Sequence, residues 1–195
     1  MAIDLKLISE LRQQTGAGLA DCRKALEENG GDQAKALEYL RKKGAKTLSE
    51  RADRVTKEGV IATYVHSNKK LAAMVALGCE TDFVAKNQDF SDLAYELAMQ
   101  VAATEPTYIK PENIPADVLE NKKNEIRQEL AEQGKTGDMV EKIMEGKLNK
   151  WYEEVCLMNQ FSIKDDKMKM IDILNGKVAA IGEKVEVLDM YRMKI

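Results

Sequence analysis

The segment LAAMVALGC, at positions 71–79, contains only apolar residues and glycine. A strand that has one face in water normally alternates between polar and apolar residues. We therefore predict that this segment is a strand that needs cover on both faces. Whatever surrounds it has to supply two separate apolar layers.

Two other segments can pair with this strand. The segment GVIATYVH, at positions 59–66, is rich in residues that favour strands, and the SNKK that follows it is typical of a turn. Residues 185–195 alternate between apolar and polar side chains, as a half-buried strand does. The sequence thus predicts a small three-stranded antiparallel sheet. Helices can cover only one face of it completely, so a second copy of the chain would cover the other, and we expect a homodimer.

The remaining segments have the periodicity of helices. Residues 4–43 are predicted to form three short helices, the last of which ends at Gly44. Residues 88–103 give the clearest helical pattern, because their apolar residues recur three or four positions apart. Further helices are predicted at about 115–133, 138–158 and 170–182.

The predicted fold class is α+β. Residues 1–44 are expected to form an N-terminal three-helix module, which should be small because three short helices bury little surface. The charged segment 45–58 is predicted to be a linker, partly helical at most. Residues 59–195 are predicted to form the core and dimerisation domain, in which the small three-stranded antiparallel sheet packs against helices.

Charge and composition limit the classes of partner. The chain has 30 basic and 33 acidic residues, and this balance offers no basic field to neutralise the phosphates of a nucleic acid. The longest apolar run, 71–77, is too short to span a bilayer, and the start MAIDLKLISE is unlike a signal peptide. Cys22, Cys79 and Cys156 show neither zinc-ligand spacing nor a disulfide framework. We expect a cytoplasmic protein with no direct nucleic-acid or membrane contact.

Candidate catalytic groups are few. His66 is the only histidine, and pairing it with Cys79 would suggest a small hydrolase, although no local signature supports this. The segment TGAG, at positions 15–18, precedes a predicted helix but lacks the ending of a phosphate-binding loop. We expect no catalytic residue, cofactor or metal site, which favours a binding or regulatory protein.

The segment CETDFVAKN, at positions 79–87, places Phe83 directly after Asp82 at a predicted turn, where polar residues are usual. The ring either packs in the chain's own core against Phe90 or Leu93, or stays outside and enters a partner. Spacing alone supports the two alternatives about equally.

Two motifs make the chain similar to the elongation factor Ts family, the guanine-nucleotide exchange factors of bacterial and organellar elongation factor Tu. LRQQTGAGLADCRKAL, at positions 11–26, resembles the family's N-terminal signature, and CETDFVAKN resembles its second and more specific one. The similarity extends through GVIATYVH, EGKLNKWYEEVCL and AAIGEKVEV, and so covers essentially the whole chain. The chain resembles the short form of the family, which implies a homodimer that lacks the coiled-coil insertion of longer members.

The resemblance also implies a mechanism and a set of contact residues. Asp82 and Phe83 would form a tip that enters the nucleotide-binding domain of elongation factor Tu. Phe83 would act as a wedge between two helices, and Asp82 would perturb the network around the magnesium ion and the phosphates, so that GDP leaves. The other positions that match are Thr81, Val84, Arg12, Leu19, Ala20, Arg23, His66, Ile181 and Gly182.

Several of these residues have simpler interpretations. Leu19 also falls on the predicted inward stripe of its helix, Gly182 suits an ordinary helix end, and His66 suits a plain strand position. Residues 4–43 also resemble the ubiquitin-associated-type module of nascent-chain-binding proteins. A helical adaptor for nascent chains or ubiquitin-like partners is therefore the alternative function.

Overall fold

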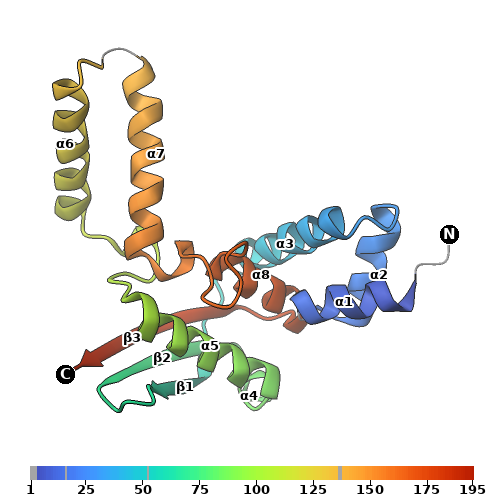
Figure 1. Cartoon of the computed structure of the whole chain (residues 1–195). Coiled ribbons are helices and arrows are strands. Elements are labelled where there is room, and N and C mark those ends of the chain that lie inside the picture. Colours follow the sequence, from blue (N-terminus) through green and yellow to red (C-terminus); the bar gives the residue numbers. More distant parts are fainter. Residues whose placement is uncertain (1–3, 16, 52, 136–137) are drawn as a thin grey trace.

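The computed structural model describes residues 4–15, 17–51, 53–135 and 138–195, so the segment TGAG, at positions 15–18, lies partly outside the described residues. Within the described residues, the predicted α+β class is confirmed (Figure 1). Three antiparallel strands form one sheet in the order β1-β2-β3. Their bounds are Glu58–Val65 for β1, Leu71–Cys79 for β2 and Val185–Lys194 for β3.

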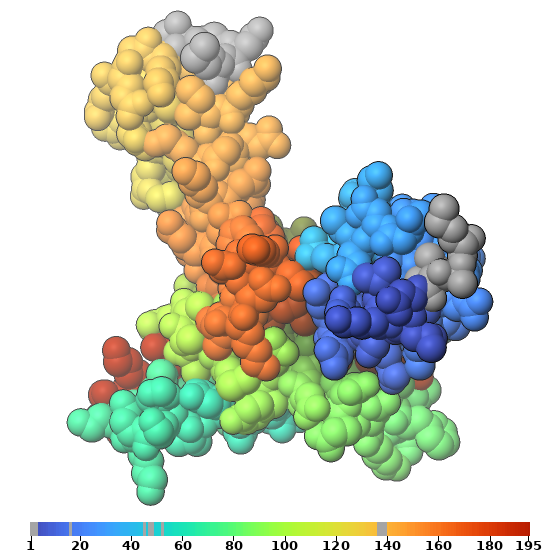
Figure 2. Space-filling view, turned by 45° about the vertical axis from the view of Figure 1, so that its right-hand side comes forward, coloured from blue at the N-terminus to red at the C-terminus, as the bar shows by residue number. Residues whose placement is uncertain are grey.

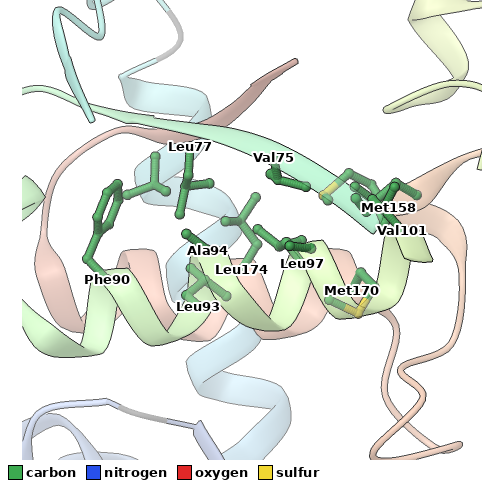
Figure 3. Close-up of a cluster of buried hydrophobic side chains, with 14 of the residues drawn as sticks. Val75, Leu77, Phe90, Leu93, Ala94, Leu97, Val101, Met158, Met170 and Leu174 are labelled. Atoms are coloured by element: carbon green, nitrogen blue, oxygen red, sulfur yellow. The ribbon is translucent and has the colours of Figure 1, made fainter. Parts of the chain in front are cut away.

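One face of the sheet carries the main core. Helices α5 (Gln88–Thr104) and α8 (Met170–Ile181) supply the apolar side chains that pack there. Val75 and Leu77 of the central strand point toward α5, as Figure 3 shows. The predicted stripe of α5 is buried, and the structure adds two alanines to it; the core residues are Phe90, Leu93, Ala94, Leu97, Val101, Ala98 and Ala102.

The side chains on the other face of the sheet are exposed in the single chain. Ile61 of β1 is 73% exposed, Met74 of β2 is 46% exposed and Tyr191 of β3 is 62% exposed. Met74 lies opposite Thr63 on one side and Tyr191 on the other, so these residues form one continuous surface. The second apolar layer that segment 71–79 needs is therefore absent from the described part of this chain.

Three helices form the N-terminal module, as predicted: α1 (Leu5–Thr15), α2 (Leu19–Glu28) and α3 (Gln33–Glu50). Their shared core consists of Ile8, Leu11, Ala17, Cys22, Ala25, Leu26, Ala36 and Leu40. This core is separate from the one beneath the sheet.

The third helix does not end at Gly44, contrary to the sequence prediction. Helix α3 continues to Glu50 and so occupies the first part of the predicted linker. At Gly44 it packs directly on α8, where an added Cβ would overlap the backbone carbonyl of Asn175. The glycine therefore permits a close helix–helix contact and is not a helix stop.

Helices α6 (Ala116–Glu132) and α7 (Asp138–Val155) form a hairpin that projects away from the rest of the molecule (Figures 1 and 2). Ile126 and Leu130 of α6 pack with Leu148 of α7 in a third small core. The sequence predicts two helices here, at about 115–133 and 138–158, and both are present. Short elements complete the fold: α4 (Asp82–Ala85) and the 3-10 turns η1 (Pro111–Asn113) and η2 (Leu157–Asn159).

We expect Gly44→Ala to loosen the packing of the N-terminal module on the core. The new methyl group meets backbone, which cannot move aside by a rotamer change, so α3 has to shift. Overpacking of this kind typically costs about 1–3 kcal/mol of folding free energy, which urea unfolding would measure. Gly146→Ala in α7 is the control, since an added Cβ there meets nothing within 4 Å beyond its chain neighbours and the backbone of its own helix. It should stabilise the chain slightly, and equal effects of the two substitutions would contradict the close contact.

Candidate functional site

Phe83 lies outside its own fold. It belongs to α4, a helix of four residues between β2 and α5, and its side chain is 83% exposed. Phe90 and Leu93, its possible core partners, are buried without it, so the core alternative for Phe83 is wrong. Val84, the next residue, packs against the main core. The short helix therefore packs one partly buried side on the core and exposes the phenylalanine ring on the other.

The carboxylate of Asp82 lies beside the ammonium group of Lys86, one turn further along. The distance from Lys86 Nζ to Asp82 Oδ2 is 2.7 Å. The hydrogen bond from Lys86 lowers the pKa of Asp82, so the carboxylate is charged at neutral pH. Because this ion pair is in contact with solvent, Asp82 can exchange Lys86 for a group on another molecule at little cost.

Thr81, directly before α4, is bound by a carboxylate from the far end of the sequence. Its backbone N–H donates to Glu183 Oε2 at 3.0 Å, and its hydroxyl donates to Glu183 Oε1 at 2.7 Å. The carbonyl of Thr81 accepts a hydrogen bond from Cys79 Sγ at 3.2 Å. The start of α4 is thus tied to the turn that follows α8.

Glu80 is the second anchor beneath the tip. Its carboxylate accepts hydrogen bonds from the backbone N–H of Lys184 at 2.6 Å, from Arg51 at 2.9 Å and from Arg54 at 2.7 Å. Burial disfavours the charged form, but these bonds outweigh it and lower the pKa of Glu80 to about 2. The carboxylate therefore links the end of α3 and the start of β3 to the base of α4.

We expect Glu80 to make stability depend on pH in the acid range. A folded-state pKa below the unfolded value stabilises the chain fully above about pH 5, and this contribution is lost as pH falls toward about 2. The free energy of unfolding of the wild type should therefore exceed that of Glu80→Gln by about 2–3 kcal/mol at pH 7, and by much less at pH 3. Urea unfolding of both proteins across this range measures the difference, and a constant gap would contradict the assignment.

Ile181 is the last residue of α8, and Gly182 begins the turn that anchors the tip. Gly182 ends α8 with a φ of 74°, and its N–H donates to the carbonyl of Val178 at 2.8 Å. The interpretation of Gly182 as a helix-end glycine is therefore confirmed. The residue after it is Glu183, which binds Thr81, so this turn and the tip also lie together.

The contact residues predicted on the N-terminal module lie on its surface. Arg12, Ala20 and Arg23 are exposed, and Arg23 pairs with Glu27 on its own helix at 2.8 Å. Leu19 is 53% exposed, so the prediction that it faces inward is wrong. It is the first residue of α2, at the end of the bundle. Figure 1 shows this module and α4 toward the same side of the molecule.

His66 lies at the opposite end of the sheet from the tip. It follows β1 at the hairpin turn, where the Tyr64 hydroxyl lies 2.9 Å from its Nδ1. Cys79 pairs with Glu58 at the other end of the hairpin, about 26 Å away at the usual rise per residue. Desolvation also raises the pKa of the Cys79 thiol. The suggested Cys79–His66 hydrolase pair is therefore wrong.

The sequence did not single out Glu183, nor Glu80 and the two arginines that bind Glu80.

Within the described residues, no group of three or more histidine, cysteine, aspartate or glutamate side chains could hold a metal ion. None of the described helices combines the length and apolar character that crossing a bilayer requires.

Comparison with known proteins identifies the family of the chain. The family model described as Elongation factor TS matches residues 8–195. The elongation factor Ts of Maridesulfovibrio salexigens is 48% identical over 195 residues, which are 100% of this chain and 95% of the relative. The elongation factor Ts of Thermotoga petrophila is also 48% identical, and that of Nitratidesulfovibrio vulgaris is 45% identical. Each alignment covers 100% of this chain and, respectively, 97% and 98% of the relative. The chain belongs to the elongation factor Ts family of translation elongation factors.

Proposed function

We propose that this chain is the guanine-nucleotide exchange factor of elongation factor Tu. The observation that carries the proposal is the exposed ring of Phe83, displayed by an anchored short helix inside a family motif. Burying a phenylalanine in a partner yields about 1.5–3 kcal/mol. This favours any partner conformation in which a pocket for the ring is open, and Asp82 would exchange Lys86 for groups around the magnesium ion and phosphates.

Exchange then follows from thermodynamic linkage. A factor that binds the nucleotide-free partner more tightly than the loaded one lowers the nucleotide affinity by the same ratio. GDP leaves faster, and GTP refills the site and displaces the factor. No covalent bond forms or breaks in this cycle, so the chain acts as a binding protein and not as an enzyme.

Two further surfaces complete the proposed contact. Arg12, Leu19, Ala20 and Arg23 would dock the N-terminal module on the nucleotide domain of the partner, and their exposure supports this. His66 lies at the far end of the sheet, where it would meet a different domain of the partner.

The open face of the sheet supports a homodimer. Its exposed apolar side chains cross all three strands, and contiguous patches of this kind mark interaction sites. The same patch on a second copy, related by a two-fold axis, would provide the second apolar layer. We place this dimer in the cytoplasm, with elongation factor Tu as its partner and no direct contact with nucleic acid or membrane. The exposed apolar residues of the open sheet face are Ile61, Val65, Met74, Leu188, Tyr191 and Met193.

Release of fluorescently labelled GDP from elongation factor Tu tests the function. Substoichiometric amounts of the chain should accelerate release in the presence of excess unlabelled nucleotide, because each factor acts many times. A GTPase of another family is the control and should release GDP at its own rate. Unchanged release from elongation factor Tu at every concentration of the chain would refute the proposal.

A further inference from the structure

We propose that Glu183 is a positioning residue that sets the orientation of the Asp82–Phe83 tip, an inference that rests on the exchange function proposed above. The tip is carried by α4, which has only four residues. A helix this short is not stable by itself, because nucleation is unfavourable and few hydrogen bonds follow it. Its direction therefore depends on contacts with the rest of the chain, which are the packing of Val84 and Ala85 on the main core and the hydrogen bonds at its N-terminal end.

The contact at the N-terminal end of α4 is a carboxylate. Thr81 occupies the N-cap position, yet its side chain caps no backbone N–H of the helix. Its hydroxyl and its own N–H both donate to Glu183, at 2.7 and 3.0 Å. Hydrogen bonds to a charged acceptor are stronger than neutral ones, and two bonds to one carboxylate fix direction as well as distance.

Glu183 is itself held in place by the turn around it. Gly182 before it adopts the left-handed conformation, and the N–H of Lys184 after it donates to Glu80. Two consecutive residues of this turn therefore hold two consecutive residues at the base of the tip. Glu80 has further partners at the end of α3, whereas the hydroxyl and N–H of Thr81 are both bound by Glu183. Loss of Glu183 would release Thr81 while Glu80 stays anchored.

Releasing Thr81 should affect the exchange step more than binding. Phe83 follows two residues later, so a rotation at Thr81 moves the ring away from the path into the partner. A ring that no longer meets its pocket loses the effect of its burial, which corresponds to about 10- to 150-fold in rate. The exposed module surface and His66 do not depend on this contact, so most of the affinity for the partner should remain.

The test is the concentration dependence of GDP release with Glu183→Ala. The maximal exchange rate should fall between about tenfold and a hundredfold, as expected if the ring largely loses its burial in the partner. The partner concentration that gives half of this rate should change less than about threefold. Glu183→Gln keeps an acceptor oxygen for one of the two donors of Thr81, so it should retain part of the exchange rate that Glu183→Ala loses. If the alanine variant does not fold, the glutamine variant takes its place in the test. In the free chain, the amides of Ala85 and Lys86, which donate to the carbonyls of Thr81 and Asp82, should exchange hydrogen faster.

Glu186→Ala is the matched control. The Glu186 carboxylate accepts a hydrogen bond from Thr56 at 2.7 Å and pairs with Lys184 at 3.2 Å, three residues from Glu183. Glu186 lies at the start of β3, close to Glu183, but it does not bind Thr81. Its loss should therefore lower the stability of the chain and leave the maximal exchange rate unchanged.

Two results would overturn the positioning role of Glu183. One is wild-type exchange by Glu183→Ala with unchanged amide exchange, and the other is a loss of rate no larger than that of Glu186→Ala. Failure of the exchange function itself would look different. In that case the wild type would not accelerate GDP release, while the amide exchange of Ala85 and Lys86 would still report whether Glu183 orients α4.

Discussion

Phe83→Ala should lower the rate of GDP release from elongation factor Tu by about 10- to 150-fold and leave the stability of the free chain unchanged. The loss in rate corresponds to the burial free energy of a phenylalanine, about 1.5–3 kcal/mol, and interface energy often concentrates in such anchors. The ring is 83% exposed in the free chain, so its removal should change the free energy of unfolding by less than about 0.5 kcal/mol. Stopped-flow release of labelled GDP and thermal unfolding measure the two quantities.

Phe90→Ala provides the opposite control within the same segment. Phe90 is fully buried under the sheet, so its truncation should cost about 3–5 kcal/mol of folding free energy. The difference between the two changes in unfolding free energy distinguishes a ring that binds a partner from a ring that stabilises the fold. If Phe83→Ala destabilised the free chain as much as Phe90→Ala does, or if it exchanged GDP like the wild type, the wedge would be refuted.

The sheet and its main covering helix could be predicted because their signals are local. Segment 71–79 is apolar at every position, and it forms the central strand. The apolar stripe of residues 88–103 is buried as its periodicity predicts. Gly44 was misread because its role depends on Asn175, which lies far away in the sequence and makes no local pattern with it.

The candidate site was only partly predictable for the same reason. Motif spacing placed Phe83 at a turn, but helical spacing allowed either orientation of the ring, and only the packing of Val84 and Phe90 decides between them. Glu183 binds Thr81 across 102 residues of sequence, so no periodicity could reveal it. The one signal nearby was the family resemblance of the preceding turn at Ile181 and Gly182.

The adaptor alternative explains too little of the molecule. It accounts for the N-terminal module alone, whereas the family model matches residues 8–195. The module is also packed on the core, because α3 meets α8 at Gly44 so closely that an added Cβ would overlap the backbone of Asn175. A module held in this way fixes the position of Arg12 and Arg23 relative to the tip, as a two-point contact with one partner would require.

Met74→Glu should convert the proposed homodimer into a monomer. Met74 lies at the centre of the open sheet face, between Thr63 and Tyr191 on the neighbouring strands. In a two-fold dimer the substitution buries two carboxylates without partners, and an uncompensated buried charge costs about 3–5 kcal/mol. The dissociation constant should therefore rise at least about a hundredfold. The side chain is 46% exposed in the single chain, so the monomer itself should still fold.

Sedimentation equilibrium distinguishes the outcomes, because the monomer mass is 21.9 kDa. The wild type should sediment as twice this mass at micromolar concentrations, and Met74→Glu as the single mass. Leu5→Glu is the control: Leu5 is 78% exposed at the start of α1, away from the sheet, so the variant should remain a dimer. A wild type that stays monomeric, or a Met74→Glu variant with the mass of the dimer, would mean that the open face of the sheet is not where two copies meet. The second apolar layer of β2 would then have to come from another protein.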